Sequence, residues 1–186
     1  MNYSRGITLL ETVVWIGIFT FAMTAVSQSV LYFFRTSTYS IQESTEVTST
    51  QRGIDSMVRS IREAAYSNVG AFPIVTISTS SFTYYANTDT DSLVEQVRYY
   101  VSGTTLYLGI IKPTGDPAVY TGAEATSTVS EYIKNISQGV NLFTYYDAAG
   151  AQISDFTKIG NVRFVTVNLV ADIDPNRAPT LITLRS

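Results

Sequence analysis

The chain contains neither cysteine nor histidine. Without cysteine it can form no disulfide bond, and it offers no thiolate to a metal ion or to a substrate. Without histidine it lacks the side chain that most often serves as a general base and as a zinc ligand. These two absences exclude cysteine-based catalysis, histidine-based acid–base catalysis and the common zinc sites.

Charged residues are also few, and the net charge of the chain is −3. Residues 67–186 carry ten acidic side chains against seven basic ones. A nucleic-acid surface needs clustered lysine and arginine residues that displace counterions from the phosphates. We therefore expect no nucleic-acid partner.

An apolar stretch without any charge runs from Thr12 to Phe34. About 20 apolar residues are enough to cross a hydrocarbon core as a helix. In lipid, a single segment has to be helical because only a helix satisfies its own backbone. Arg5 precedes the stretch, so the positive-inside rule predicts a cytoplasmic N-terminus, with the rest of the chain beyond Arg35 on the other side.

One acid, Glu11, lies at the start of this stretch, and no Lys, Arg or His occurs between Gly6 and Arg35 to pair with it. A carboxylate at mid-depth in a bilayer costs about 2.5–3.5 kcal/mol, so a retained one usually has a partner. Two interpretations stay open. Glu11 either interacts with the positive end of the helix dipole, which is worth less than about 1 kcal/mol, or it neutralises an α-amine. A cut after Gly6 would create such an amine at Ile7.

Residues 6–11, Gly-Ile-Thr-Leu-Leu-Glu, together with the apolar run behind them, resemble the class III leader of type IV pilins and type II secretion pseudopilins. The resemblance implies that a prepilin peptidase removes residues 1–6 by cutting between Gly6 and Ile7, and that it then N-methylates Ile7. It also implies that Glu11 is the assembly residue, which pairs with the N-terminus of a neighbouring subunit. Ile7 departs from the family pattern, which usually has Phe at this position.

The resemblance further implies a structural subunit and not an enzyme. Its partners would be the prepilin peptidase, major and other minor pilin subunits, an inner-membrane platform protein and membrane lipid. It would be a single-pass protein of the bacterial inner membrane with its globular domain outside, and part of a pilus or pseudopilus after assembly. The segments Val97–Val101, Leu142–Asp147 with Gly150, and Leu184–Ser186 resemble the minor pilin pattern, which favours a minor subunit.

The helical pattern continues beyond the uncharged stretch, so we predict one helix over residues 7–66. Residues 7–34 form its apolar transmembrane and assembly part, and residues 35–66 form an amphipathic continuation. An apolar stripe at spacings of three and four marks this second part. The stripe contains Ile41, Thr45, Thr48, Ile54, Met57, Val58, Ile61 and Ala65.

Residues 67–186 change to a period of two, which predicts a β-rich globular domain. The expected strands are residues 74–79, 81–86, 93–101, 104–111, 140–146, 163–172 and 181–185, and the third and fourth of them form a hairpin. Residues 128–137 are compatible with either a short helix or the start of a strand. A long helix followed by short strands predicts an α+β fold with an antiparallel sheet laid against the helix.

The oxygen side chains of Asn87, Asp89 and Asp91 follow one another at the spacing that opens a calcium loop. The rest of that motif is missing, because Ser92 replaces the glycine of the sharp turn and Arg98 replaces the bidentate glutamate. The resemblance to pseudopilins implies that calcium is a candidate ligand, because some pseudopilins bind it in a sheet loop. An ordinary Asp/Asn-rich turn is the favoured interpretation, and the same holds for Asp172, Asp174 and Asn176.

Two other functions remain open. The chain could be a non-polymerising single-span membrane protein whose extracytoplasmic domain binds a ligand. It could also be a membrane-tethered hydrolase, which would need converging carboxylates in a pocket. The sequence places no pair of acids in a context typical of glycoside hydrolysis, so we assign no catalytic residue.

Overall fold

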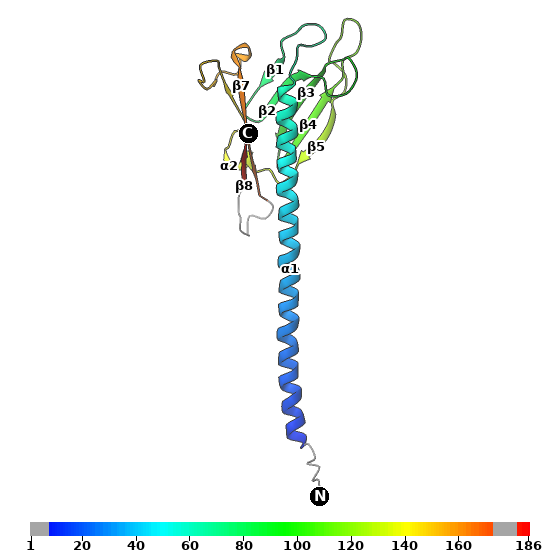
Figure 1. The fold of residues 1–186 in the computed structure, drawn as a ribbon, viewed down its shortest axis with the longest axis vertical. Coiled ribbons are helices and arrows are strands. Elements are labelled where there is room, and N and C mark those ends of the chain that lie inside the picture. The colour runs from blue at the N-terminus through cyan, green and yellow to red at the C-terminus, as the bar shows by residue number, and fades with distance from the viewer. Residues whose placement is uncertain (1–7, 173–181) are drawn as a thin grey trace. The chain divides into compact units, whose positions relative to one another are not determined.

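The computed structural model describes residues 8–172 and 182–186 (Figure 1). It divides between Ser44 and Thr45 into two compact units, each of which is described by itself. Helix α1, Leu9–Arg62, contributes residues to both units. Its length follows from the absence of proline between these residues, since an interior proline would remove a backbone hydrogen bond. An α+β fold is confirmed.

Helix α1 ends at Arg62 and not at residue 66. Ala65, which we placed on the helical stripe, instead donates its backbone N–H to Tyr85 O at 2.9 Å. Ala64 forms an isolated antiparallel bridge with Ala86. The helix therefore ends where the backbone gains partners in a strand, which local helical spacing cannot reveal.

Five antiparallel strands form the larger sheet, in sequence order. They are β1 (Ile74–Ile77), β2 (Ser81–Ala86), β3 (Glu95–Ser102), β4 (Thr105–Ile111) and β5 (Ala125–Ser130). The predicted hairpin is confirmed as β3 and β4, with Ser102 opposite Thr105 and Gly103 in the left-handed region at φ 61°. The sequence did not predict β5, because most of its side chains are exposed and give no apolar alternation.

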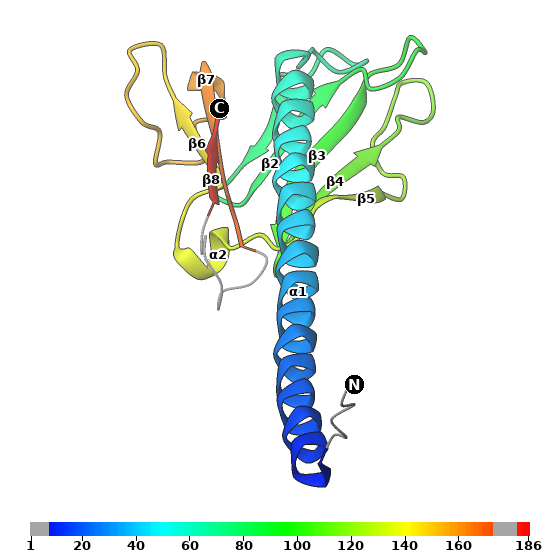
Figure 2. The same cartoon turned by 60° about the horizontal axis from the view of Figure 1, so that its bottom comes forward.

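A second sheet of three antiparallel strands corrects the expectation of a single sheet (Figure 2). Its strands are β6 (Phe143–Tyr146), β7 (Phe164–Ala171) and β8 (Ile182–Arg185). The short helix α2 (Asn135–Gln138) follows β5, so residues 128–137 contain both the end of a strand and a helix. The 3-10 helix η1 (Ile159–Asn161) precedes β7.

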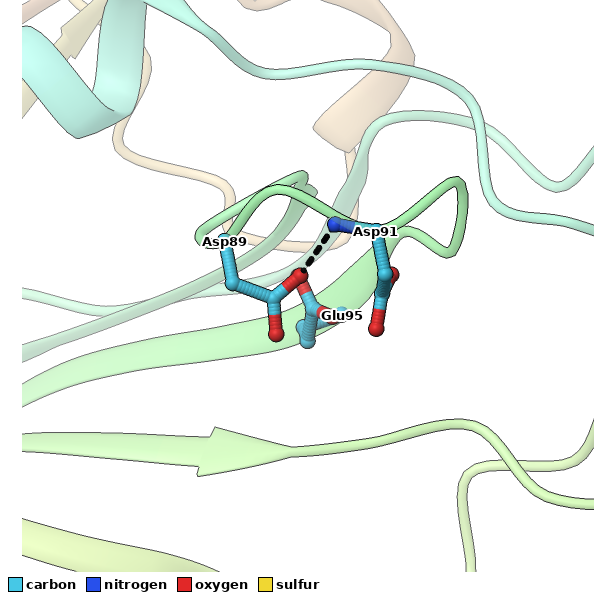
Figure 3. A group of neighbouring side chains, drawn as sticks. All are labelled: Asp89, Asp91 and Glu95. Atoms are coloured by element: carbon cyan, nitrogen blue, oxygen red, sulfur yellow. Dashed lines mark hydrogen bonds between the residues drawn. The ribbon is translucent and has the colours of Figure 1, made fainter.

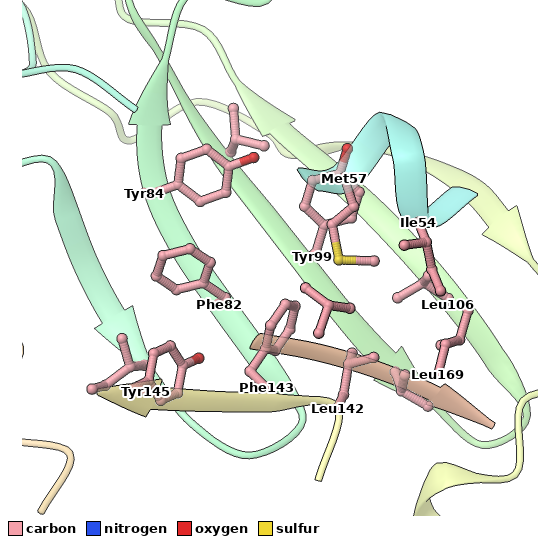
Figure 4. Packing of buried hydrophobic residues seen from close by; sticks show 14 of the residues in the cluster. Ile54, Met57, Phe82, Tyr84, Tyr99, Leu106, Leu142, Phe143, Tyr145 and Leu169 are labelled. Atoms are coloured by element: carbon pink, nitrogen blue, oxygen red, sulfur yellow. The ribbon is translucent and has the colours of Figure 1, made fainter. Parts of the chain in front are cut away.

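The core of the second unit joins both sheets and the last part of α1 (Figure 4). Ile54 and Met57 of the helix are buried, as the stripe predicts. Phe82 connects the two sheets, because its ring lies 5.0 Å from that of Tyr84 in its own strand and 5.7 Å from that of Phe143 in β6. The stripe does not predict burial correctly at Ile41, which is 65% exposed and belongs to the first unit.

Polar contacts fix this packing. Tyr84 donates its hydroxyl to Ser60 Oγ at 2.6 Å, which connects β2 to α1. Asn135 connects α2 to β7 by donating to Asn168 O at 2.8 Å and accepting from Val170 N at 2.9 Å. Because these groups are largely buried, each missing bond would leave an unsatisfied donor or acceptor. The two sheets and the helix segment therefore form one core.

A chain shortened to begin at Thr36 should fold without detergent, because the residues that are buried in the described part of the chain lie between Thr50 and Asp172. We expect a single cooperative unfolding transition in urea, followed by circular dichroism. Aggregation, or loss of signal without a transition, would show that residues before Thr36 belong to the core.

In that shortened chain, Met57→Ala should lower the free energy of unfolding by about 2–5 kcal/mol, because it leaves a cavity beneath the helix. The matched control is Arg59→Ala on the exposed side of the same helix. This substitution should change the free energy of unfolding by less than about 0.5 kcal/mol. Equal effects would contradict the packing of α1 on the sheets.

Candidate functional site

The apolar part of α1 is the first candidate site. One helix long and apolar enough to span a membrane, Leu9–Tyr39, lies near the N-terminus. Thr20 and Thr24 do not interrupt its apolar surface, because their hydroxyls donate to the backbone of Ile16 and Thr20 at 2.8 Å. Such local bonds satisfy the hydroxyl inside the helix itself. The helix surface is therefore compatible with lipid or with other apolar helices.

Glu11 occupies the third position of this helix, in its first turn. Thr8, just before the helix, accepts a hydrogen bond on its Oγ1 from the backbone N–H of Glu11 at 3.3 Å. Thr-x-x-Glu is the capping-box spacing, in which the side chain at the third position is Glu or Gln. The hydrogen bond is made by the backbone of Glu11, so the hydroxyl of Thr8 caps the start of the helix. This cap does not account for the charge of Glu11, since Gln occupies the same position of a capping box equally well.

The nearest cation after Glu11 in the chain is Arg35, about 36 Å away along a helix with a rise of 1.5 Å per residue. No residue of the same helix can therefore pair with Glu11 before that point. Gly6 and Ile7, the predicted cleavage and methylation residues, lie outside the described residues. Their roles stay predictions.

The loop between β2 and β3 is the second candidate site. The structure brings Asp89 and Asp91 together with Glu95, so that one oxygen of each lies within 4.8 Å of the others (Figure 3). Asn87 has a different role, because its Nδ2 donates to Asp91 O at 2.8 Å and its Oδ1 accepts from Asp89 N at 3.2 Å. The sequence therefore indicated two of the three clustered carboxylates, and it missed Glu95.

Strand register explains this grouping. Glu95 is paired with Ala86, so the loop that leaves β2 returns directly beside it. Gln96 is paired with Ile111, which places Lys112 at the same end of the sheet. The signal for Glu95 was present in the sequence, because Val97, Tyr99 and Val101 alternate on the buried face and Glu95 continues that alternation.

Lys112 forms ion pairs with Asp89 and, at 3.9 Å, with Asp91. Its hydrogen bond to Asp89 lowers the pKa of that carboxyl below its usual range and raises the pKa of the lysine. Glu95 is fully buried, and its Oε2 accepts hydrogen bonds from Thr88 N at 2.8 Å and Thr88 Oγ1 at 3.1 Å. Its Oε1 has no hydrogen-bond partner among the described residues.

The second acidic segment named from the sequence does not form a comparable cluster in the described part of the chain. Asp172 is buried, and its Oδ1 lacks a partner among residues 8–172 and 182–186. Asp174 and Asn176 lie outside those ranges.

An apolar groove of about 420 Å³ lies between the end of α1 and β7. Ile61, Phe72 and Phe164 contribute apolar side chains, and Arg62 and Arg163 add two cations. Among the described residues that line it, none has a carboxylate side chain. Its volume is in the range of small-ligand pockets. The groove could accept an apolar ligand with an anionic group, and it does not present the converging carboxylates that a hydrolase would need.

A shallower hollow of about 360 Å³ lies on the outer face of the larger sheet. Arg98 donates from Nε to Glu124 Oε1 at 2.8 Å and from Nη2 to Glu124 Oε2. The guanidinium also lies 4.2 Å from the centre of the Tyr100 ring. Gly109 permits this pair, because a Cβ atom there would overlap Glu124 Oε1.

No family model matches this chain, and a search of curated proteins finds no match either.

Gly109→Ala should break the Arg98–Glu124 pair, because the new methyl group takes the space of the Glu124 carboxylate. We expect Gly109→Ala to lower the free energy of unfolding by about 0.5–1 kcal/mol more in the unchanged protein than in the Glu124→Ala variant, which has no ion pair to lose. Urea unfolding of the four proteins of this double-mutant cycle measures the difference. Additive effects would mean that Gly109 is not required for the ion pair.

Proposed function

We propose that this chain is a pilin-like structural subunit, a minor one, that assembles through helix α1 into a type IV pilus or a type II secretion or competence pseudopilus. Support comes from the leader-like residues 6–11 and from the exposed apolar helix directly behind them. The observation that carries the proposal is Glu11, a single carboxylate at the start of an otherwise uncharged helix segment.

In this proposal a prepilin peptidase cuts between Gly6 and Ile7, and the new α-amine of one subunit pairs with Glu11 of its neighbour. The attraction between opposite charges is stronger in an apolar environment than in water. Pairing also removes the cost of an isolated carboxylate in the membrane. The apolar helices would leave the bilayer of the bacterial inner membrane and pack against one another in the filament, with the β domains outside.

The proposed partners follow from this mechanism. They are the peptidase, major and other minor subunits, an inner-membrane platform protein and the lipid around the helix. The function requires no cofactor and no catalytic residue in this chain, because packing and charge pairing accomplish the assembly.

The rival function is a non-polymerising membrane protein with a ligand-binding outer domain. The groove between α1 and β7, with Arg62 and Arg163 at its lining, is the observation that favours it. The two functions predict different consequences of removing the Glu11 charge, because a simple anchor helix gains from it only the helix-dipole interaction of less than about 1 kcal/mol.

Glu11→Gln separates the charge from the capping role, since glutamine keeps the capping-box geometry. We expect the variant to be inserted and cleaved normally, while its crosslinking to other pilin subunits falls about tenfold or more. A loss of roughly 1.4 kcal/mol of pairing suffices for that factor.

The matched control is Thr8→Ala, which removes the capping hydroxyl and leaves the charge. It should weaken the helix start by about 1 kcal/mol and leave crosslinking near the level of the unchanged protein. If Glu11→Gln associates as well as the unchanged protein, the assembly role of Glu11 is wrong and the anchor function is preferred.

The proposed processing is tested by the intact mass of the protein recovered from its own cells. We expect a chain that begins at Ile7 and carries one added methyl group. Gly6→Val should remain at full length in the membrane, because the peptidase is expected to require glycine there. A mature mass for that variant would contradict the cleavage site.

A further inference from the structure

The groove between the end of α1 and β7 belongs to the second unit, and assembly through the apolar part of α1 makes no use of it. Its volume is about 420 Å³. Phe82, Val162 and Val167 line it, and all three are buried members of the core. An apolar occupant would therefore remove its own surface from water against side chains that are already packed, which favours binding.

Two aromatic side chains extend this apolar lining toward solvent. Phe72 is 39% exposed and Phe164 is 61% exposed. Phe72 is held by an edge-to-face contact with Tyr66, whose ring centre lies 6.4 Å away. Single exposed apolar residues are common on protein surfaces, but a concave, mainly apolar lining with a few polar groups is typical of ligand pockets.

The charge at the lining is positive. Arg62 lies in the last turn of α1, and Arg163 directly precedes β7. Glu63 follows Arg62 in the sequence, but it is not part of the lining and forms no ion pair among the described contacts. Ser186 also lines the groove, and its backbone O accepts a hydrogen bond from Val167 N at 3.0 Å. The lining side chains therefore favour an occupant with an anionic group.

The guanidinium of Arg163 is held in a position that suits a carboxylate. Its Nη1 donates to Gly160 O and to Val162 O, both at 2.8 Å. These two bonds use both hydrogens of Nη1 and leave Nε and Nη2 without a partner among the described contacts. The N–H groups of that edge are parallel, as the two oxygens of a carboxylate require. Because the guanidinium is already fixed, little side-chain freedom is lost on binding.

We propose that this groove binds a free medium-chain carboxylate. The carboxylate lies on the Nε–Nη2 edge of Arg163 with Arg62 as the second cation, and the alkyl chain lies against Phe72, Phe164 and the core. A volume of about 420 Å³ corresponds to roughly a dozen water-sized groups of about 30 Å³ each, so a chain of about eight carbons fits. The inference concerns the second unit alone, so its failure would leave the proposed role of Glu11 untouched.

The test is photolabelling of the full-length protein in phosphatidylcholine nanodiscs with an octanoate analogue that carries a diazirine on its alkyl chain. Mass spectrometry then identifies the labelled peptides. We expect labelling of the peptides that contain Phe72 or Phe164. Unlabelled octanoate should suppress it at an at least about tenfold lower concentration than octanol, which has the same chain length without the charge. Labelling of Leu9–Tyr39 by probe dissolved in the bilayer provides the internal reference.

Arg163→Gln removes the fork and should lower labelling of the groove, relative to that reference, about tenfold at a subsaturating probe concentration. Arg185→Gln is the matched control, because Arg185 is exposed in the neighbouring strand β8 and does not line the groove. It should leave labelling unchanged. Phe164→Ser is the second variant, since so exposed a side chain is dispensable for the core. It should lower labelling about threefold or more by removing apolar contact with the chain.

Labelling confined to Leu9–Tyr39, or labelling of the groove that octanoate does not suppress, would overturn the proposal. Equal suppression by octanol and octanoate would overturn the role of the carboxylate, and equal labelling of Arg163→Gln and Arg185→Gln would overturn the role of Arg163. The source of the acyl chain is tested with a photoactivatable phosphatidylglycerol in the nanodisc. If that lipid labels the groove and octanoate does not compete, a membrane lipid is the occupant and the free carboxylate is wrong.

Discussion

The second unit depends on the burial of aromatic rings between its two sheets and the end of α1. Phe82 is the central residue, since its ring contacts Tyr84 within the larger sheet and both Phe143 and Tyr145 of β6. Met57 is completely buried in the same cluster. Aromatic rings bury large apolar areas, so these few contacts account for much of the packing. The loops and grooves described above are positioned by this core.

The same core explains why a carboxylate is held beneath the β2–β3 loop. Pairing of β2, β3 and β4 fixes Glu95 beside Ala86 and brings Lys112 to the same end of the sheet. Because the strands cannot shift without exposing Val97 and Tyr99, Glu95 cannot turn toward water. Thr88 donates two hydrogen bonds to Oε2 of this carboxylate, and its Oε1 has no hydrogen-bond partner among the described residues.

Helix α1 meets two different requirements along its length. From Thr12 to Phe34 it is uncharged and mainly apolar, and the hydroxyls of Thr20 and Thr24 donate to backbone carbonyls of the preceding turn, which suits a membrane or other helices. From Ile54 onward one face is buried against the sheets while Arg59 and Arg62 stay exposed. Gly53 lies where the helix approaches β5, since a Cβ there would come within 3.0 Å of the Val129 side chain.

Hydropathy and local spacing sufficed to predict much of this protein. The uncharged run after Glu11 predicted the apolar helix, and alternation predicted the buried faces of β3 and β7, where Val97, Tyr99, Val167 and Leu169 are all inside. The turn at Gly103 predicted the β3–β4 hairpin. Each of these signals is carried by residues that are close in the sequence, so the chain determines them before any tertiary contact forms.

The tertiary structure decided the rest. The division into two sheets depends on which strands pair, and β5 pairs with β4 although its own side chains give no apolar pattern. The helix ends early because Ala65 finds a partner in β2. The carboxylate cluster combines Glu95 of β3 with Asp89 and Asp91 of the preceding loop, and Lys112 follows β4, so only strand register brings the lysine beside them. Long-range pairing is set by competition among many strands for one core, and no single stretch of sequence records its outcome.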